Sequence, residues 1–201
     1  MITPKSTARA VAVGASAGGV TALQTLICAL PTDFPAAVVV VQHLDPHHRS
    51  RLAEVVGRHA HVPVKEAVDG ELLGPGTVYI APPDSHLIVS AGHVSLTSSG
   101  LVHFSRPSID LLFTSVAETY GADAIGVVLT GSGRDGATGI RDIKQHGGTT
   151  MIQDPEEAQY PSMPQHARAT GCIDYSLALA EIVPMIVTLL MPGGRTNGGD
   201  P

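Results

Sequence analysis

The chain has 201 residues, 43% of them hydrophobic and 15% charged, with a formal net charge of −6 and no tryptophan. This length suits one well-buried domain, and this composition is typical of a globular protein whose core is built from Val, Ile, Leu and Ala. The acidic balance gives no electrostatic footprint for a nucleic acid partner or for an anionic membrane surface.

The cysteines and the hydropathy pattern indicate in which cellular compartment the protein resides. Cys28 and Cys172 lie far apart and outside any C-x-x-C spacing, so they predict free thiols in a reducing compartment. No uninterrupted apolar stretch reaches the roughly 18 residues of a membrane helix. We therefore expect a cytoplasmic protein without membrane insertion. Residues 9–191 are predicted to form a single domain, after a loose leader at 1–8 and before a disordered tail at 192–201.

Predicted strands and helices alternate along the chain. The unbroken apolar run at residues 36–41 is typical of a strand covered on both faces, as in a parallel sheet. The predicted strands are residues 9–13, 36–41, 62–67, 77–81, 124–129, 149–153 and 172–175. The predicted helices are residues 18–30, 50–59, 107–120, 137–146 and 177–190, with one or two short helices within 156–170.

Residues 86–97 depart from this alternation. They change polarity from residue to residue around Gly92, which predicts an antiparallel hairpin. The whole pattern therefore indicates a doubly wound α/β fold: a mostly parallel sheet flanked by helices, joined by right-handed crossovers, with an antiparallel hairpin excursion.

The stretch VAVGASAGGV at residues 11–20 is the most informative one. Residues 14–18 match the G-x-S-x-G spacing of a nucleophile elbow, in which a strand turns sharply into a helix and exposes the hydroxyl of Ser16. Small neighbours suit a turn in which the backbone passes close to itself. The same residues also suit a glycine-rich loop that binds phosphate, or a plain tight turn, so the motif alone leaves three interpretations open.

Two further side chains follow buried strands. His43 comes after the strand at 36–41, and Asp135 lies in the glycine-rich loop after the strand at 124–129. The carboxyl ends of parallel strands meet at one edge of a sheet, so neighbouring strands would bring Ser16, His43 and Asp135 together. A hydroxyl, an imidazole and a carboxylate in this arrangement are the parts of an acyl-transfer site.

Other assignments stay open at this point. The chain order Ser, His, Asp differs from that of a standard α/β-hydrolase. Asp135 also suits an N-cap for the helix that begins near Ala137. The rival base is His86, and the rival acids are Asp45, Asp84 and Asp154.

Metal and dinucleotide sites are weaker alternatives. Among the histidines at positions 43, 47, 48, 59 and 61, no carboxylate completes a known ligand pattern. A dinucleotide loop would need glycine where Ser16 stands, although Asp45 lies at an acceptable distance to bind a ribose.

Six ordered blocks resemble the catalytic domain of the chemotaxis protein-glutamate methylesterase family, CheB. They span the chain from about residue 11 to residue 190 and are far more specific together than any single motif. The blocks are GASAGG at 14–19, VVQHLDP at 40–46, YIAPPDSHL at 79–87, RPSIDLLF at 106–113, VVLTGSGRDGATG at 127–139 and QDPEEAQYPSMP at 153–164.

The resemblance implies a serine hydrolase that cleaves glutamate γ-methyl esters on chemoreceptors and, in some members, deamidates glutamines. It implies that Ser16 is the nucleophile, His43 the general base and Asp135 the acid that orients it, without a cofactor. The partner would be a methylated chemoreceptor or a similar helical protein. For the oxyanion hole we expect backbone N–H groups of Ala17, Ser132 and Gly133.

Two departures from the family pattern lead to further expectations. Ser132 and Leu44 stand where the family commonly has methionine, and the smaller, polar Ser132 alters the packing around the oxyanion loop. No receiver domain precedes residue 9, so control would come from a separate receiver-domain protein, or the chain is part of a longer protein or serves another pathway. The alternatives are a catalytically impaired scaffold or binding module on the same fold, and a nucleotide-binding enzyme.

Overall fold

A seven-stranded parallel sheet forms the centre of the protein in the computed structural model, which describes residues 9–43 and 50–191. The strands in chain order are β1 (Ala10–Ala15), β2 (Ala37–Gln42), β3 (Val64–Glu66), β4 (Val78–Ile80), β7 (Ala124–Val128), β8 (Thr149–Gln153) and β9 (Tyr175–Leu177). They lie in the order β3-β4-β2-β1-β7-β8-β9, and every pairing is parallel. The chain therefore starts at the middle of the sheet and winds outward in both directions, which confirms the predicted doubly wound fold.

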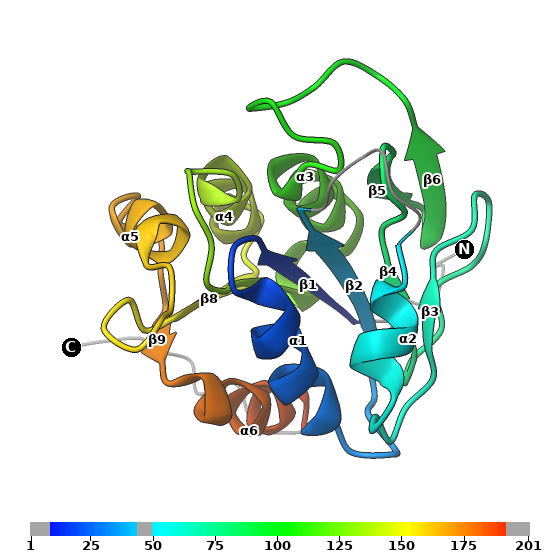
Figure 1. Ribbon diagram of the computed structural model, residues 1–201, viewed down its shortest axis with the longest axis horizontal. Coiled ribbons are helices and arrows are strands. Elements are labelled where there is room, and N and C mark those ends of the chain that lie inside the picture. Colours follow the sequence, from blue (N-terminus) through cyan, green and yellow to red (C-terminus); the bar gives the residue numbers. More distant parts are fainter. Residues whose placement is uncertain (1–8, 44–49, 192–201) are drawn as a thin grey trace, which may run out of the picture.

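Helices cover both faces of the sheet (Figure 1). One face carries α1 (Gly19–Cys28), α2 (Leu52–Gly57) and α6 (Leu179–Leu190), and the other carries α3 (Ile109–Tyr120), α4 (Ala137–Gln145) and α5 (Ser162–Arg168). A short 3-10 helix, η1 (Gly121–Asp123), joins α3 to β7. The predicted hairpin is present as β5 (His86–Ser90) and β6 (His93–Thr97), which form a separate antiparallel sheet.

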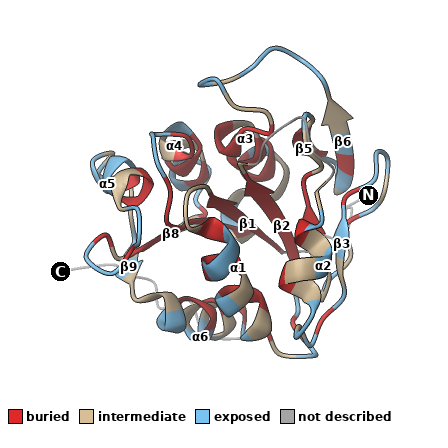
Figure 2. Ribbon diagram, viewed as in Figure 1, coloured by how far each residue is buried: buried red, intermediate tan, exposed pale blue. Residues whose placement is uncertain are grey.

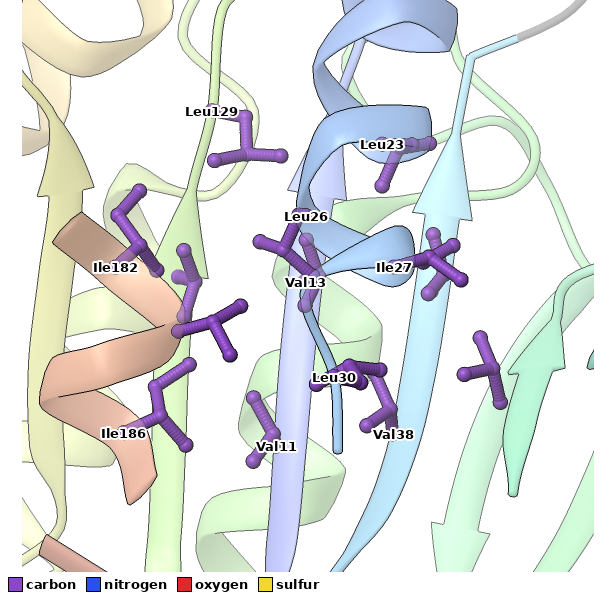
Figure 3. Packing of buried hydrophobic residues seen from close by; sticks show 14 of the residues in the cluster. Val11, Val13, Leu23, Leu26, Ile27, Leu30, Val38, Leu129, Ile182 and Ile186 are labelled. Carbon is purple, nitrogen blue, oxygen red and sulfur yellow. The ribbon is translucent and has the colours of Figure 1, made fainter. Parts of the chain in front are cut away.

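Each face of the sheet buries its own hydrophobic cluster (Figure 2). On the first face, Leu23, Leu26 and Ile27 of α1 share one cluster with Val11 and Val13 of β1. Figure 3 shows Leu26 beside Val13 and Ile27 over the neighbouring strand, β2. The alternate residues of β1, Ala10 and Ala12, face α3. Small residues on this second face let α3 lie close to the sheet, which matters below because the start of α3 contacts the candidate site.

The structure corrects the predicted bounds of the last strand. The last strand is Tyr175–Leu177 rather than 172–175. Asp174 explains the shift, because its carboxylate accepts hydrogen bonds from the Thr150 backbone and hydroxyl, and Thr150 also binds Cys172 O. Residues 172–174 are thus held mainly through the side chains of Thr150 and Asp174, with one backbone bond from Asp174 N to Thr150 O at 3.1 Å.

Of the one or two short helices predicted within residues 156–170, one forms, α5. The segment before it is held instead by the loop after β7. Tyr160 N donates to Thr130 Oγ1 at 2.9 Å, and Gly131 N donates to Tyr160 O at 2.9 Å. These bonds occupy backbone groups that a helix would need for itself.

Some sequence predictions concern residues outside the described ranges. These are the leader at 1–8, the tail at 192–201, and Leu44, Asp45, His47 and His48. Within the described ranges, none of the helices has the length and the apolar composition needed to cross a bilayer.

Candidate active site

Ser16 lies in the sharp turn between β1 and α1. Ser16 N donates to Thr130 O at 3.1 Å, and Gly19 N donates to Ser16 O at 2.8 Å. Gly18, the N-cap of α1, has φ 74°, a left-handed conformation that glycine adopts at little cost. Gly14 is needed for a different reason: a Cβ there would lie 2.3 Å from Ile109 Cγ2. The glycines of the motif therefore permit both the turn and the close approach of α3.

His43 follows β2, the immediate neighbour of β1. Its backbone N–H extends the parallel pairing by donating to Ala15 O at 3.1 Å. The buried amide of Gln42 links the segment after β1 to the segment after β2. Its Nε2 donates to Ser16 O at 2.8 Å and to His43 O at 2.9 Å. This clamp fixes the backbone of both predicted site residues.

The side chains of Ser16, His43 and Asp135 form one continuous hydrogen-bonded chain. His43 Nδ1 lies 3.2 Å from Ser16 Oγ, and His43 Nε2 lies 2.9 Å from Asp135 Oδ2. A carboxylate only accepts hydrogen bonds, so the ring proton of the neutral imidazole belongs on Nε2. Nδ1 then has a free lone pair that accepts the Ser16 hydroxyl proton.

Asp135 is held in a pocket built entirely of hydrogen-bond donors. Its side chain is 3% exposed. Besides His43, it accepts from Ser108 Oγ at 3.1 Å, Ile109 N at 2.8 Å, Asp110 N at 2.9 Å and Gly136 N at 3.0 Å. The backbone donors from Ile109 and Asp110 are the N-terminus of α3, whose dipole also favours negative charge.

Two opposing effects act on the acidity of Asp135. Burial alone would raise its pKa, but the hydrogen bonds from His43 and from the α3 backbone outweigh burial and hold the pKa below its usual range. The carboxylate therefore stays ionised and keeps the imidazole oriented.

Asp135 does not act as the N-cap of α4, contrary to one of the alternatives above. The N-cap is Gly136, and the carboxylate that receives the first N–H groups of α4 is Asp110. Asp110 Oδ1 accepts from Gly136 N at 2.9 Å and from Gly139 N at 2.8 Å. The helices α3 and α4 pack side by side with their N-termini together. Asp135, which precedes α4, therefore accepts the first N–H groups of α3, and Asp110 of α3 accepts those at the start of α4.

Asp110 has the opposite electrostatic character to Asp135. Burial raises its pKa, and the neighbouring Asp135 charge adds to this, while the N–H groups of Gly139 and Gly136 lower it. The net effect raises the pKa of Asp110. His103 Nε2 lies 3.2 Å from its outer oxygen, Oδ2.

A cavity of about 180 Å³ opens beside His43 and Asp135. Its other walls are the loop after β7 and an exposed loop around Phe104, whose side chain is 97% exposed. The lining residues are His43, His103, Phe104, Ser105, Ser132, Gly133, Arg134 and Asp135. His43 and the loop after β7 thus face a space that a side chain from another molecule can enter.

The candidate oxyanion donors lie next to Ser16. A Cβ on Gly131 would lie 2.8 Å from Ser16 Cβ, so the loop after β7 passes directly beside the nucleophile candidate. Gly131 N is engaged by Tyr160 O. For Ala17, Ser132 and Gly133, the described chain records no acceptor for the backbone N–H, which leaves these three groups open to a substrate oxygen.

Comparison with known proteins gives a consistent result. The family model for CheB methylesterase matches residues 11–186. The chain belongs to the CheB methylesterase family. The solved catalytic domain of the Thermotoga maritima CheB methylesterase superposes with a TM-score of 0.86 at 38% identity, over 90% of this chain and 98% of that one.

Curated CheB relatives fall into two sizes. A Leptospira interrogans protein is 38% identical over 90% of this chain and 94% of its own length. A Cupriavidus metallidurans relative, named protein-glutamate methylesterase/protein-glutamine glutaminase 2, is 43% identical over 96% of this chain but only 57% of its own length. This chain therefore spans about half the length of the larger CheB relatives. These matches do not favour the scaffold or nucleotide-binding alternatives.

The rival residues have other partners in this CheB fold. His86 is fully buried, with Nε2 3.0 Å from Gly100 O and Nδ1 accepting from Ser108 N. Asp84 pairs with Arg106, and Asp154 with Arg168. Within residues 9–43 and 50–191, no group of three or more His, Cys, Asp or Glu side chains is arranged to hold a metal ion.

Sequence reasoning missed Gln42, Ser108 and Asp110, which support the CheB site without touching the cavity. Gln42 had a signal in its position between a buried strand and His43. Ser108 had one in the Ser-x-Asp pattern that starts an apolar helix, since serine is a favoured N-cap. The role of Asp110 at α4 had no signal, because it depends on how two helices pack.

Proposed function

We propose that this protein is a serine hydrolase that cleaves glutamate γ-methyl esters in proteins, with Ser16 as nucleophile, His43 as general base and Asp135 as the orienting acid. The observation that supports this most directly is the hydrogen-bonded chain from Ser16 Oγ through both ring nitrogens of His43 to Asp135. The names of the relatives, which state a methylesterase and a glutaminase activity, agree with it.

The first half-reaction transfers the glutamyl group to Ser16. The hydroxyl oxygen attacks the γ-carbonyl carbon while its proton passes to His43 Nδ1. Asp135 stabilises the imidazolium that forms. As the tetrahedral intermediate collapses, His43 returns this proton to the departing methoxide, and methanol leaves with a glutamyl ester on Ser16.

The second half-reaction restores the enzyme. A water molecule gives a proton to His43 Nδ1 and attacks the same carbonyl carbon, and Ser16 Oγ leaves with that proton. The product is a free glutamate side chain. With a glutamine substrate the same steps release ammonia, which accounts for the second activity named for the relatives.

The negative oxygen of each tetrahedral intermediate needs hydrogen-bond donors. We assign this role to the backbone N–H groups of Ala17, Ser132 and Gly133, which have no acceptor within the described chain. The loss of one such donor typically costs about 3–4 kcal/mol of transition-state stabilisation. Ser132 is exposed and lines the cavity, and the role that we assign to it belongs to its backbone N–H.

The substrate we propose is a methylated chemoreceptor or a similar helical protein, acted on in the cytoplasm. Residues 9–191 would form the catalytic domain as a single unit, and a receiver-domain protein would regulate it. This assignment is supported by the membership of the CheB family and by a cavity that opens beside His43 and Asp135.

Methanol release from a methylated receptor fragment tests the proposal. We expect the wild-type protein to release methanol and the Ser16→Ala variant to release it at least 1,000-fold more slowly, as for other nucleophile deletions (roughly 10³–10⁶). Ser95→Ala is a matched control, since Ser95 is an exposed serine on β6, in the antiparallel hairpin outside the candidate site. Methanol release that survives Ser16→Ala would refute the assigned nucleophile.

A further inference from the structure

A second pocket continues from the candidate active site along α4. It has a volume of about 320 Å³, within the range of about 300–1,000 Å³ typical of ligand sites. It shares His103 and Arg134 with the cavity beside His43. Arg141 and His166 complete its charged and imidazole lining, and small residues at the start of α4 and just after α5 make up the rest.

The two arginines of this pocket differ from the other basic side chains. Nine lysines and arginines fall within residues 9–43 and 50–191, and six of them form ion pairs with aspartate or glutamate. The other three are Arg58, Arg134 and Arg141. Arg58 lies close enough to Glu54 to lower the pKa of that carboxyl, which leaves Arg134 and Arg141 with no recorded acidic neighbour in the described chain.

Two guanidinium groups in one pocket, neither in an ion pair within residues 9–43 and 50–191, are unexpected on an acidic protein. The formal net charge of −6 repels an acidic partner at long range, and a local basic pocket compensates for this where the partner docks. Guanidinium groups bind carboxylates through charge-assisted and often bidentate hydrogen bonds. The chemistry of the pocket therefore fits a carboxylate.

The position of the pocket indicates which carboxylate. Ala137 and Arg141 line it from one face of α4, four residues and so about 6 Å apart along the helix. Arg134 stands between the pocket and Asp135. The two cavities share His103 and Arg134, so this pocket adjoins the one beside His43. A helical substrate with its ester at Ser16 carries side chains one and two turns away, about 5–11 Å along its axis, that could enter an adjoining pocket.

We propose that the pocket lined by Arg134 and Arg141 is a specificity site for a glutamate carboxylate of the substrate protein, one or two helical turns from the glutamyl ester. The proposal rests on the proposed function, because it assumes that a glutamate-bearing protein segment docks at Ser16. It makes the enzyme selective for esters in acidic helical segments.

The test measures binding and hydrolysis separately. Binding uses the Ser16→Ala protein and fluorescent helical peptides with one γ-methyl glutamate and, four or seven residues to either side, a glutamate, a glutamine or a lysine. We expect the best glutamate peptide to bind about threefold to tenfold more tightly than its glutamine counterpart at low salt. Arg141→Gln should abolish this preference, and Arg141→Glu should transfer it to the lysine peptide.

Arg58→Gln and Arg58→Glu are the matched controls. They alter an exposed arginine at the end of α2 by the same charge, and they should leave the preference among peptides unchanged. Equal weakening of all peptides by Arg141 and Arg58 variants would overturn the proposal, since it would indicate only long-range attraction. Arg141-dependent binding of free glutamate or inorganic phosphate, without a preference among peptides, would overturn it as well.

Hydrolysis by the wild-type protein separates the two proposals. Methanol release from all peptides at equal kcat/KM would support the esterase and refute the carboxylate site. An Arg141-dependent binding preference without methanol release from any peptide would refute the esterase while retaining the docking site.

Discussion

Replacing Asp135 with asparagine tests the role of the hydrogen-bond donors that surround its carboxylate. All five partners of the carboxylate act as donors: His43 Nε2, Ser108 Oγ and three backbone N–H groups. The asparagine NH2 group would therefore face at least one fixed N–H donor in either orientation. A buried donor without an acceptor costs about 1–3 kcal/mol, and the lost charge-assisted bonds add to this. We expect a loss of about 2–4 kcal/mol in the free energy of unfolding.

Activity should fall further than stability. If the asparagine NH2 donates to His43 Nε2, the ring proton moves to Nδ1, which can no longer accept the Ser16 proton. The same change of tautomer in a serine protease triad costs about 10⁴-fold in kcat. We expect methanol release to fall about 10³–10⁴-fold, equivalent to roughly 4–5.5 kcal/mol.

Asp110→Asn is the matched control, because Asp110 is also a buried aspartate at a helix start. Its Oδ1 accepts both Gly136 N and Gly139 N, which an amide oxygen can still do, and its Oδ2 faces only His103. Chemical denaturation and methanol release should place this variant within about 1 kcal/mol and within about tenfold of wild type. Equal losses of stability and of methanol release in Asp135→Asn and Asp110→Asn would refute the argument that the donors around Asp135 require a carboxylate.

Two further predictions concern pH and the glycine contact. The pKa of Asp135 lies below its unfolded value of 3.8, so its contribution to stability is complete above about pH 4 and is lost as pH falls through the folded pKa. The difference in free energy of unfolding between wild type and Asp135→Asn, measured by urea denaturation, should therefore narrow below pH 4. A difference that widens there would contradict the lowered pKa. Gly14→Ala places a Cβ 2.3 Å from Ile109 Cγ2 and should lower the melting temperature by about 3–10 °C. Gly100→Ala, where a Cβ meets nothing within 4 Å, should change it little, so equal shifts would argue against the contact.

Much of the fold and the three proposed catalytic residues could be predicted from the sequence. The reason is physical: buried parallel strands show as unbroken apolar runs, and their carboxyl ends must meet at one edge of the sheet. Ser16, His43 and Asp135 each follow such a run, and β2 and β7 are the two neighbours of β1.

The residues that hold Ser16, His43 and Asp135 in place could not be predicted in the same way. Asp110 and Asp135 cap each other's helices because α3 and α4 pack with their N-termini together, and no local pattern encodes that packing. The orientation of the His43 ring, with Nδ1 toward Ser16, depends on the same arrangement. The strand shift at Asp174 likewise arises from a side chain that binds a neighbouring strand.

Covalent labelling with a fluorophosphonate tests the central claim, an activated hydroxyl at Ser16, most directly. The account predicts one modified residue, Ser16, located by mass spectrometry of the intact protein and its peptides. It also predicts that labelling slows at least 100-fold in His43→Gln, where Nδ1 is lost as the proton acceptor (general-base effects are roughly 10²–10⁴). Modification of another serine, or labelling of Ser16 at the same rate without His43, would contradict it.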